Sequence, residues 1–399
     1  MAALNMPQMT MRRNRERNQS DGCFMIGVAQ IISRKAIVKK PAQVVGHMRR
    51  VRAASLALLA CVGLACADAG AQGASFSGKR PAAGILCLAG PDGGGRSAFD
   101  NAVVDGVILR TSWALTEPQN GVYDWNSIDR LVQEARRTGK IFGLGVVAGF
   151  RSPEWFLRSG ALTLTTDFSR NYAQQRQITV PVPWDPAFQR KWGEFLQAAA
   201  ARYDAEPAVA YVLIAGLGQA FEPFMARTPE DRRAFEAMGG LPRWIEGAKL
   251  VIDLYALHFK STPFVLTMHN PVLSAEGEQA IRAVVEYGLR AYPGRFGIKY
   301  DGLDAVASPD VASPANFYHR AIFEWSARTP VGYQMVWATQ GINAKWLRGT
   351  LEEVLERGVA VKAHFVEVYA VDCNNPQFSN VLKRASAGLR ANAAIFSRR

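Results

Sequence analysis

The sequence predicts a single (β/α)8 barrel, an α/β fold of the TIM-barrel type, with an elaborated loop after its third strand. Apolar runs rich in Val, Ile, Phe and Tyr alternate along the chain with stretches of helical periodicity, which is the sequence sign of βα units. There are eight such runs, the number of strands that closes a barrel. With 399 residues, of which 49% are hydrophobic and 20% charged, the chain can bury one large core.

Each barrel strand is expected where an apolar run is flanked by Gly, Pro or polar residues. The eight runs are Gly84–Ala89, Val104–Trp113, Lys140–Ala148, Val209–Ala215, Phe264–Asn270, Phe296–Asp301, Val331–Trp337 and Val361–Tyr369. Apolar residues at helical spacing predict the intervening helices, among them Ile128–Ala135, Phe188–Tyr203, Trp244–His258, Ala280–Tyr292 and Leu351–Arg357.

Two connections are long enough to shape a cleft. Residues 151–184 contain two strand-like segments, Leu162–Thr166 and Gln177–Val182, which could form a hairpin over the barrel mouth. Residues 221–241, rich in charge and Gly, form the second long loop. Long loops at the C-terminal face are where barrel enzymes build their substrate sites.

The segment before the barrel is typical of an export signal. Residues Met48–Arg52 are basic, Ala53–Ala65 form a short apolar run, and small residues follow, so 48–71 is predicted to be a signal peptide that directs the chain to the periplasm or the extracellular space. Translation is expected to begin at Met48, in which case residues 1–47 precede the true start and are not part of the protein. A basic, disordered leader is the alternative.

The remaining boundaries follow from that signal. Residues 72–83 are a short linker and 84–395 the barrel domain. The apolar run is too short for a transmembrane span. Leu58–Cys61 resembles a lipoprotein cleavage box, but its apolar stretch would be very short, so simple export is preferred over a lipid anchor at Cys61.

The positive charge of the chain lies mostly outside the barrel. The formal charge is +13, and residues 1–69 contribute +8 of it through eleven basic and three acidic residues. The remainder carries +5, which is too mild for a phosphate-binding surface, so no nucleic-acid partner is expected.

After signal cleavage two cysteines remain, Cys87 in the first expected strand and Cys373 after the last. A closed barrel makes these strands neighbours, so a disulfide could link them in an oxidising compartment. Two separate buried thiols are an equally good interpretation, because free cysteine is often buried as a small apolar residue.

A sequence signature follows the second expected strand. Residues Trp113–Asp129 read WALTEPQNGVYDWNSID and resemble a signature of (β/α)8-barrel glycoside hydrolases. In those enzymes a Trp ends the second strand, a loop with Glu-Pro and Asp-Trp crosses the barrel top, and Ile-Asp begins the next helix. The segments Gly149–Trp155 and Val182–Pro186 continue the likeness, which spans roughly residues 84–390. It is nearest in character to family-42-like β-galactosidases and their secreted relatives.

The resemblance implies hydrolysis of an O-glycosidic bond in an oligo- or polysaccharide. Such enzymes usually place two carboxyl groups on either side of the scissile bond, one as general acid and one as nucleophile or base. The resemblance puts the acid/base at the end of strand four, usually after an Asn. Here Glu222, several residues late, is the carboxylate nearest that point, and we expect it to be the acid/base. A solvated loop carboxylate is the alternative.

The second carboxylate departs from the family pattern. The resemblance places it on strand seven, where this chain has Gln334, which cannot act as a nucleophile. Glu367, on the eighth expected strand, is the predicted substitute. A carboxylate in so apolar a strand must be paired or must point into a polar cavity. We favour the cavity, with an ion pair to Arg110 as the alternative.

Since strands four and eight lie opposite each other, Glu222 and Glu367 could face each other across a sugar. Asp301, at the end of the sixth strand, is the reserve second carboxylate, and a turn-forming Asp-Gly is its alternative.

The other candidates are polar groups that bind hydroxyls and aromatic rings that stack on sugar faces. The predicted substrate-binding residues are Arg110, Trp113, Trp155, His269, Asn270, Asp301, Gln334, Trp337 and Tyr369. For the rings the alternative is the core, for Arg110 an ion pair at the barrel bottom, and for Asn270 a helix cap.

The sequence contains no motif that is typical of another kind of chemistry. The five histidines are widely spaced, without the His or Cys pairs of a zinc site, and no phosphate-binding or dinucleotide-binding glycine motif occurs, so no metal or cofactor is expected. The departures at strands four and seven raise a second hypothesis: a glycan-binding pseudoenzyme that keeps the barrel but lacks turnover.

Overall fold

The computed structural model describes residues 79, 81–89, 96–167, 177–223, 226, 228–310 and 316–397. The predicted leader at 1–47, the signal peptide at 48–71 with its lipid site at Cys61, and most of the linker lie outside these residues. Within the described part of the chain, no helix combines the length and the apolar character that crossing a membrane requires.

Eight parallel strands form a closed barrel, which confirms the predicted fold class. Around the barrel they follow chain order, and the last strand pairs with the first. The barrel strands are β1 (Gly84–Ala89), β2 (Gly106–Ser112), β3 (Ile141–Val147), β6 (Val209–Leu213), β7 (Phe264–Thr267), β8 (Phe296–Leu303), β9 (Val331–Met335) and β10 (Phe365–Tyr369). All eight lie within or overlap the predicted runs, with ends that differ by a few residues.

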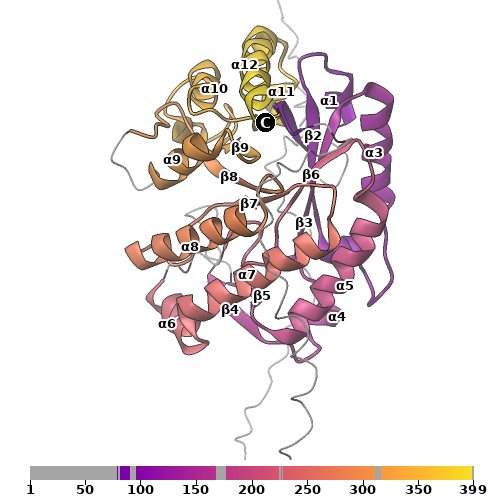
Figure 1. Ribbon diagram of the computed structural model, residues 1–399, viewed down its shortest axis with the longest axis vertical. Coiled ribbons are helices and arrows are strands. Elements are labelled where there is room, and N and C mark those ends of the chain that lie inside the picture. Colours follow the sequence, from indigo (N-terminus) through magenta and orange to yellow (C-terminus); the bar gives the residue numbers. More distant parts are fainter. Residues whose placement is uncertain are drawn as a thin grey trace, which may run out of the picture. The chain divides into compact units, whose positions relative to one another are not determined.

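The longer helices lie outside the strands (Figure 1). They are α3 (Asn126–Thr138), α5 (Pro186–Tyr203), α6 (Pro229–Ala237), α7 (Gly240–His258), α8 (Ala275–Ala291), α9 (Asn316–Trp325), α10 (Leu351–Ala360) and α12 (Ser379–Ser397). Shorter helical segments are α1 (Arg96–Asp100), α2 (Trp113–Thr116), α4 (Glu154–Leu157), α11 (Ala370–Cys373), η1 (Ala344–Leu347) and η2 (Pro376–Phe378).

Local sequence explains where these helices begin and end. Asp185 accepts hydrogen bonds from the first turn of α5, and Pro186 follows it at a position where no backbone donor is needed. Thr350 and Glu353 form a reciprocal capping box at the start of α10. Gly139 ends α3 with φ of 67°, a conformation that glycine adopts without steric cost.

The long connection after the third barrel strand contains the predicted hairpin. Strands β4 (Thr163–Asp167) and β5 (Gln177–Pro181) pair antiparallel in a separate two-stranded sheet. Thr166 of β4 accepts a hydrogen bond from Gln219 in the connection that follows β6. The hairpin is therefore joined to the loop that carries Glu222.

Glycines on the barrel wall leave room for two large rings inside it. Tyr211 of β6 and Phe365 of β10 stack with centroids 5.0 Å apart. A Cβ at Gly143 would lie 2.6 Å from the Tyr211 ring, and one at Gly332 would lie 2.3 Å from the Phe365 ring. Side chains therefore fill the barrel below the polar groups at its mouth.

Candidate active site

The centre of the barrel contains a buried ion cluster built around Glu367. One oxygen of this carboxylate, Oε2, accepts from Arg110 Nη2 at 2.7 Å and from Lys299 Nζ at 2.8 Å. The other, Oε1, accepts from the Tyr211 hydroxyl at 3.0 Å. These donors come from β2, β8 and β6, so closure of the barrel brings them together.

This geometry does not fit the predicted role of Glu367 as the second catalytic carboxylate. Its side chain has 0% exposed surface, and both of its oxygens are engaged. A sugar at the barrel mouth cannot contact it. The ion pair with Arg110, the alternative considered from the sequence, is present, and Lys299 adds a second cation. Burial opposes the charge of Arg110, but Glu367 and Asp301 outweigh burial and raise its pKa.

Asp301 lies on the same strand as Lys299 and faces the same side, because side chains two residues apart share a face. Lys299 Nζ is 2.6 Å from Asp301 Oδ1, and Arg110 Nη2 is 3.7 Å from Oδ2. Within the described residues no hydrogen bond reaches Oδ2. Burial alone would raise the pKa of Asp301, but the charges of Lys299 and Arg110 lower it to about 2. The carboxylate is therefore ionised at neutral pH, and its buried Oδ2 accepts no hydrogen bond from the described residues.

The connection after β6 explains how Glu222 reaches the barrel mouth although it comes late in the sequence. Leu217 O accepts from Trp244 Nε1 at 2.9 Å, and Gln219 O accepts from Phe150 N at 2.7 Å. Gly216 has a φ of 93°, and a Cβ there would lie 2.8 Å from the Phe188 ring. These contacts turn the chain inward, so that Phe221 packs under the Arg110 guanidinium, 5.3 Å from ring centroid to Cζ.

Glu222 and Asp301 meet at the mouth together with His269. One ligand atom from each of the three lies within 4.8 Å of the others. Glu222 and Asp301 are each 9% exposed, whereas Glu367 is 0% exposed. The mouth therefore contains a close pair of carboxylates, and the pair is Glu222 and Asp301.

The same three side chains could hold a divalent cation, since two carboxylates and an imidazole are acceptable ligands. The prediction of no metal site did not anticipate this set. Lys299 and Arg110 already pair with Asp301, however, and they would repel a cation bound beside it. The charge distribution thus favours an uncharged ligand over a metal ion.

The structure also gives the surroundings of three other predicted binding residues. Gln334 donates to the Tyr369 hydroxyl at 3.2 Å, and within the described residues its Oε1 has no hydrogen-bond partner. Trp337 and Trp155 are half-buried. Gln334 thus stands on β9, the seventh barrel strand, where the resemblance places the nucleophile. Its buried amide oxygen accepts no hydrogen bond from the described residues.

Two predicted binding residues are corrected by the structure. Trp113 is 0% exposed and packs against five other rings, so it cannot stack on a sugar. Asn270 accepts from Val272 N and Ser274 N and donates to Ser274 O, so its side chain organises the turn that precedes α8. For Trp113 the structural alternative considered from the sequence, the core, is the one present; Asn270 is in the turn, and the N-cap of α8 is Ser274.

The signature that begins at Trp113 serves the fold. Trp113 Nε1 donates to Glu117 Oε2 at 2.6 Å, and Gly121 N donates to the other oxygen at 2.8 Å. Asp129 accepts from the hydroxyl of Tyr203 on α5 at 2.8 Å. The polar side chains of Glu117 and Asp129 therefore fix the loop and the helix after β2.

Sequence reasoning missed Lys299 and Tyr211. The signal for Lys299 was available, because a lysine inside the apolar run Phe296–Asp301 must find a buried anion. Tyr211 gave no such signal, since tyrosine is common in strands. Its hydroxyl is identified only by its contact with Glu367.

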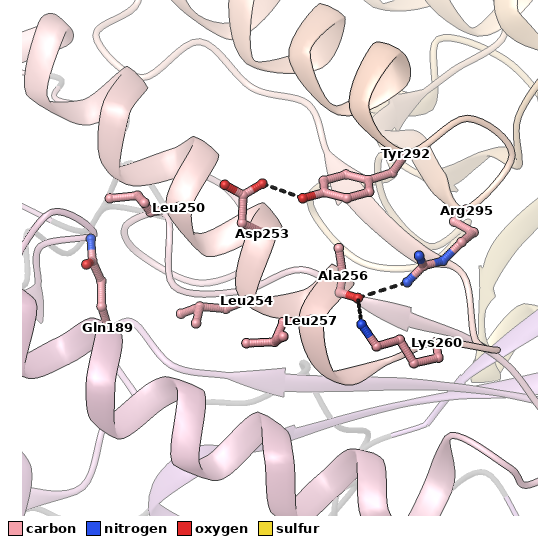
Figure 2. Close-up of a pocket in the computed structure, with 9 residues that line it drawn as sticks. All are labelled: Gln189, Leu250, Asp253, Leu254, Ala256, Leu257, Lys260, Tyr292 and Arg295. Carbon is pink, nitrogen blue, oxygen red and sulfur yellow. Dashed lines mark hydrogen bonds between the residues drawn. The ribbon is translucent and has the colours of Figure 1, made fainter. Parts of the chain in front are cut away.

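A pocket of about 510 Å³ lies elsewhere, among helices of the outer layer (Figure 2). It is lined by residues of α5, of α7 and of the chain that follows α8. Its polar groups bond mainly to one another: Asp253 accepts from Tyr292 at 2.7 Å, and Ala256 O accepts from Arg295 at 3.0 Å. No candidate site residue lines it, so we place the active site at the barrel mouth.

Comparisons with known proteins agree with this architecture. Residues 99–216 match the model of glycoside hydrolase family 42, described as β-galactosidase. The fold is similar to the catalytic domain of the β-amylase from Paenibacillus polymyxa, with a TM-score of 0.51 and 11% identity over 77% of this chain and 100% of that one. A cold-adapted β-galactosidase from Rahnella sp. R3 gives a TM-score of 0.50 at 11% identity, over 81% of this chain and 58% of that one. No curated protein sequence matches.

The fold is a (β/α)8 barrel, and one segment of it, residues 99–216, is similar to a glycoside hydrolase family. The specific likeness is to family-42 β-galactosidases, and it runs from α1 to the residue Gly216 beyond β6. It includes Arg110 but ends before Glu222. The carboxylates of the site therefore lie outside the matched segment, and their roles must be argued from geometry.

Proposed function

We propose that this chain hydrolyses an O-glycosidic bond, with Glu222 as the general acid/base and Asp301 as the nucleophile. The observation that carries the proposal is the approach of these two carboxylates to within 4.8 Å at the barrel mouth. Retaining glycosidases hold their carboxyl groups about 5–5.5 Å apart, and inverting ones about 6.5–9.5 Å apart. The short separation supports retention of the anomeric configuration.

The assignment of roles follows from the surroundings of each group. A nucleophile must be ionised, and Lys299 and Arg110 hold the pKa of Asp301 at about 2. Asp301 is slightly exposed, and its buried Oδ2 accepts no hydrogen bond from the described residues, so we assign this oxygen to the attack on the anomeric carbon. An acid/base must exchange protons with a leaving group, and Glu222, on the connection after β6, lies within 4.8 Å of Asp301 and is therefore in reach of the same glycosidic bond.

The substrate class follows from the fold likeness and from the aromatic residues that remain partly exposed. Trp155, Trp337 and Tyr369 are half-buried, and such rings can pack on the C–H faces of sugars. A β-linked galactoside is the first substrate to test, because the matched family is described as β-galactosidase. Export through the signal at 48–71 remains a prediction from the sequence alone.

The test is hydrolysis of a panel of aryl β-glycosides by wild type, Glu222→Gln and Asp301→Asn. We expect each substitution to lower kcat/KM at least about 10³-fold, since each removes a group that acts in the transition state. Asp310→Asn changes an exposed Asp on the connection after β8, nine residues beyond Asp301, and is the matched control. Unchanged rates for both site variants would refute the assignment.

A second function, glycan binding without turnover, is favoured by Gln334 on the strand where the family places its nucleophile. It predicts that wild type binds oligosaccharides, measured by calorimetry, while no glycoside of the panel is hydrolysed. Turnover above the background of Asp301→Asn would exclude it.

A further inference from the structure

Two cysteine thiols meet where the barrel closes. Cys87 lies on β1, and Cys373 is the last residue of α11, the helical turn after β10. Strand pairing places Cys87 beside Val368 of β10, and Cys373 Sγ lies 3.6 Å from Val368 O. Cys87 Sγ in turn lies 3.9 Å from Leu88 O, on the strand that pairs with β10. Both residues are free cysteines, 0% and 1% exposed.

We propose that Cys87 and Cys373 form a disulfide that joins the first barrel strand to the last. The strand register and the contact at Val368 place both cysteines beside the same residue, and a disulfide needs their two Cβ atoms to be that close. With oxidised glutathione as the oxidant, one protein thiolate attacks a glutathione sulfur and releases the first glutathione thiol. The second protein thiolate then attacks the mixed disulfide and releases the second. The two cysteines lose two electrons and two protons, and glutathione disulfide gains them.

The bond would fix the segment that completes the site. Residues between the two sulfurs include every barrel strand after β1. Asp372, beside Cys373, accepts from Thr339 N at 3.1 Å and so ties α11 to the loop after β9. Tyr369, four residues before Cys373, receives the Gln334 side chain. A covalent link at this point would therefore hold both the closing strand pair and one wall of the barrel mouth.

Burial determines when the bond can form. The pKa of the Cys373 thiol is raised by its hydrogen bond to Cys87 and by burial, so the thiolate that attacks a disulfide is scarce in the folded chain. Formation during folding is the accessible route. Cys23, Cys61 and Cys66 are present in the full chain and compete as partners, so the pairing must be read directly.

The experiment is refolding of the full-length chain in a glutathione redox buffer, alkylation of free thiols, and tryptic digestion without reduction. Cleavage after Lys and Arg releases Cys87 in the peptide 80–96 and Cys373 in the peptide 363–383, each with one cysteine. Mass spectrometry then detects the cross-linked pair. Matched variants are Cys87→Ser, Cys373→Ser and the triple variant Cys23→Ser, Cys61→Ser, Cys66→Ser.

We expect the 80–96 and 363–383 peptides to be cross-linked in wild type and in the triple variant, and the cross-link to vanish on reduction. The thermal midpoint of the oxidised protein should exceed that of the reduced protein by on the order of 5 °C or more, because the bond closes a very long loop. The shift should be absent in Cys87→Ser. Recovery of both peptides alkylated, or joined to other cysteines, would overturn the proposal, and so would a cross-link without a rise in the midpoint.

Discussion

The carboxylates of Glu222 and Asp301 approach within 4.8 Å of each other at the barrel mouth, although 78 residues separate them in the sequence. Glu222 reaches this position on a loop turned inward after β6, and Asp301 is fixed at the end of β8 by Lys299. Each is slightly exposed, while Glu367 below them is fully buried. The barrel therefore contains two distinct groups of charges: the carboxylate pair of Glu222 and Asp301 at its mouth, and the buried ion cluster around Glu367.

Leaving-group dependence should separate the two carboxylates. Glu222→Gln removes the proton donor, so its loss of kcat/KM should be large for a poor leaving group and at least about tenfold smaller for dinitrophenolate, which departs without a proton. Asp301→Asn should slow both substrates strongly, because the nucleophile must form its bond to the anomeric carbon as the leaving-group bond breaks, whichever leaving group departs. Equal losses for both variants on both substrates would contradict the assigned roles.

The buried ion cluster around Glu367 should stabilise the folded protein. Glu367→Gln leaves Lys299 and Arg110 without their shared anion in a dry environment, which should lower the free energy of unfolding by on the order of 3 kcal/mol. The matched control is Glu352→Gln, which breaks a surface pair with Arg384 and should change stability by less than about 0.5 kcal/mol. Urea titrations measure both, and a Glu367→Gln effect as small as that of the control would contradict the cluster's role.

Lowering the pH should remove the contribution of Asp301 to the free energy of unfolding. The folded pKa of Asp301, about 2, lies below its ordinary value of 3.8. The contribution of this group is therefore present above pH 4 and is lost as the pH falls toward 2, by roughly 2 kcal/mol. Wild type should lose more stability than Asp301→Asn over this interval. Parallel curves for the two proteins would show that Asp301 is not held ionised by its neighbours.

Trp113 should matter for folding and not for sugar binding. Trp113→Phe leaves the buried Glu117 Oε2 without its donor, which should cost about 1–3 kcal/mol of stability while KM stays within about twofold. Trp337→Ala, at the end of a barrel strand, should instead raise KM with a smaller effect on stability. If Trp113→Phe raised KM without lowering stability, Trp113 would be a substrate-binding residue, and the structural role given to it here would be wrong.

The sequence allowed prediction of the eight strands because each strand leaves a local trace, an apolar run between turn residues. The hairpin of β4 and β5 was predictable for the same reason. The partners of Glu367 were not, since Arg110, Lys299 and Tyr211 lie on three other strands and meet it only when the barrel closes. The choice between Glu367 and Asp301 depended on depth within the barrel, and alternation along a strand gives the face of a side chain but not its depth.

The position of Glu222 also depended on tertiary contacts. Its loop follows from the backbone of Gly216 and from hydrogen bonds to Trp244 and Phe150, and none of these is visible as a pattern in the sequence. Glu222 could therefore be selected as a candidate, but the residue that it faces could not.

The most direct test is to trap the glycosyl-enzyme with an activated 2-deoxy-2-fluoro derivative of the hydrolysed sugar and to locate the label. Trypsin places the three carboxylates on three separate peptides: Glu222 on 203–227, Asp301 on 300–320 and Glu367 on 363–383. A retaining mechanism through Asp301 predicts a sugar bound to 300–320, at Asp301 on fragmentation. A label on 363–383, or inversion at the anomeric carbon of the product, would contradict it.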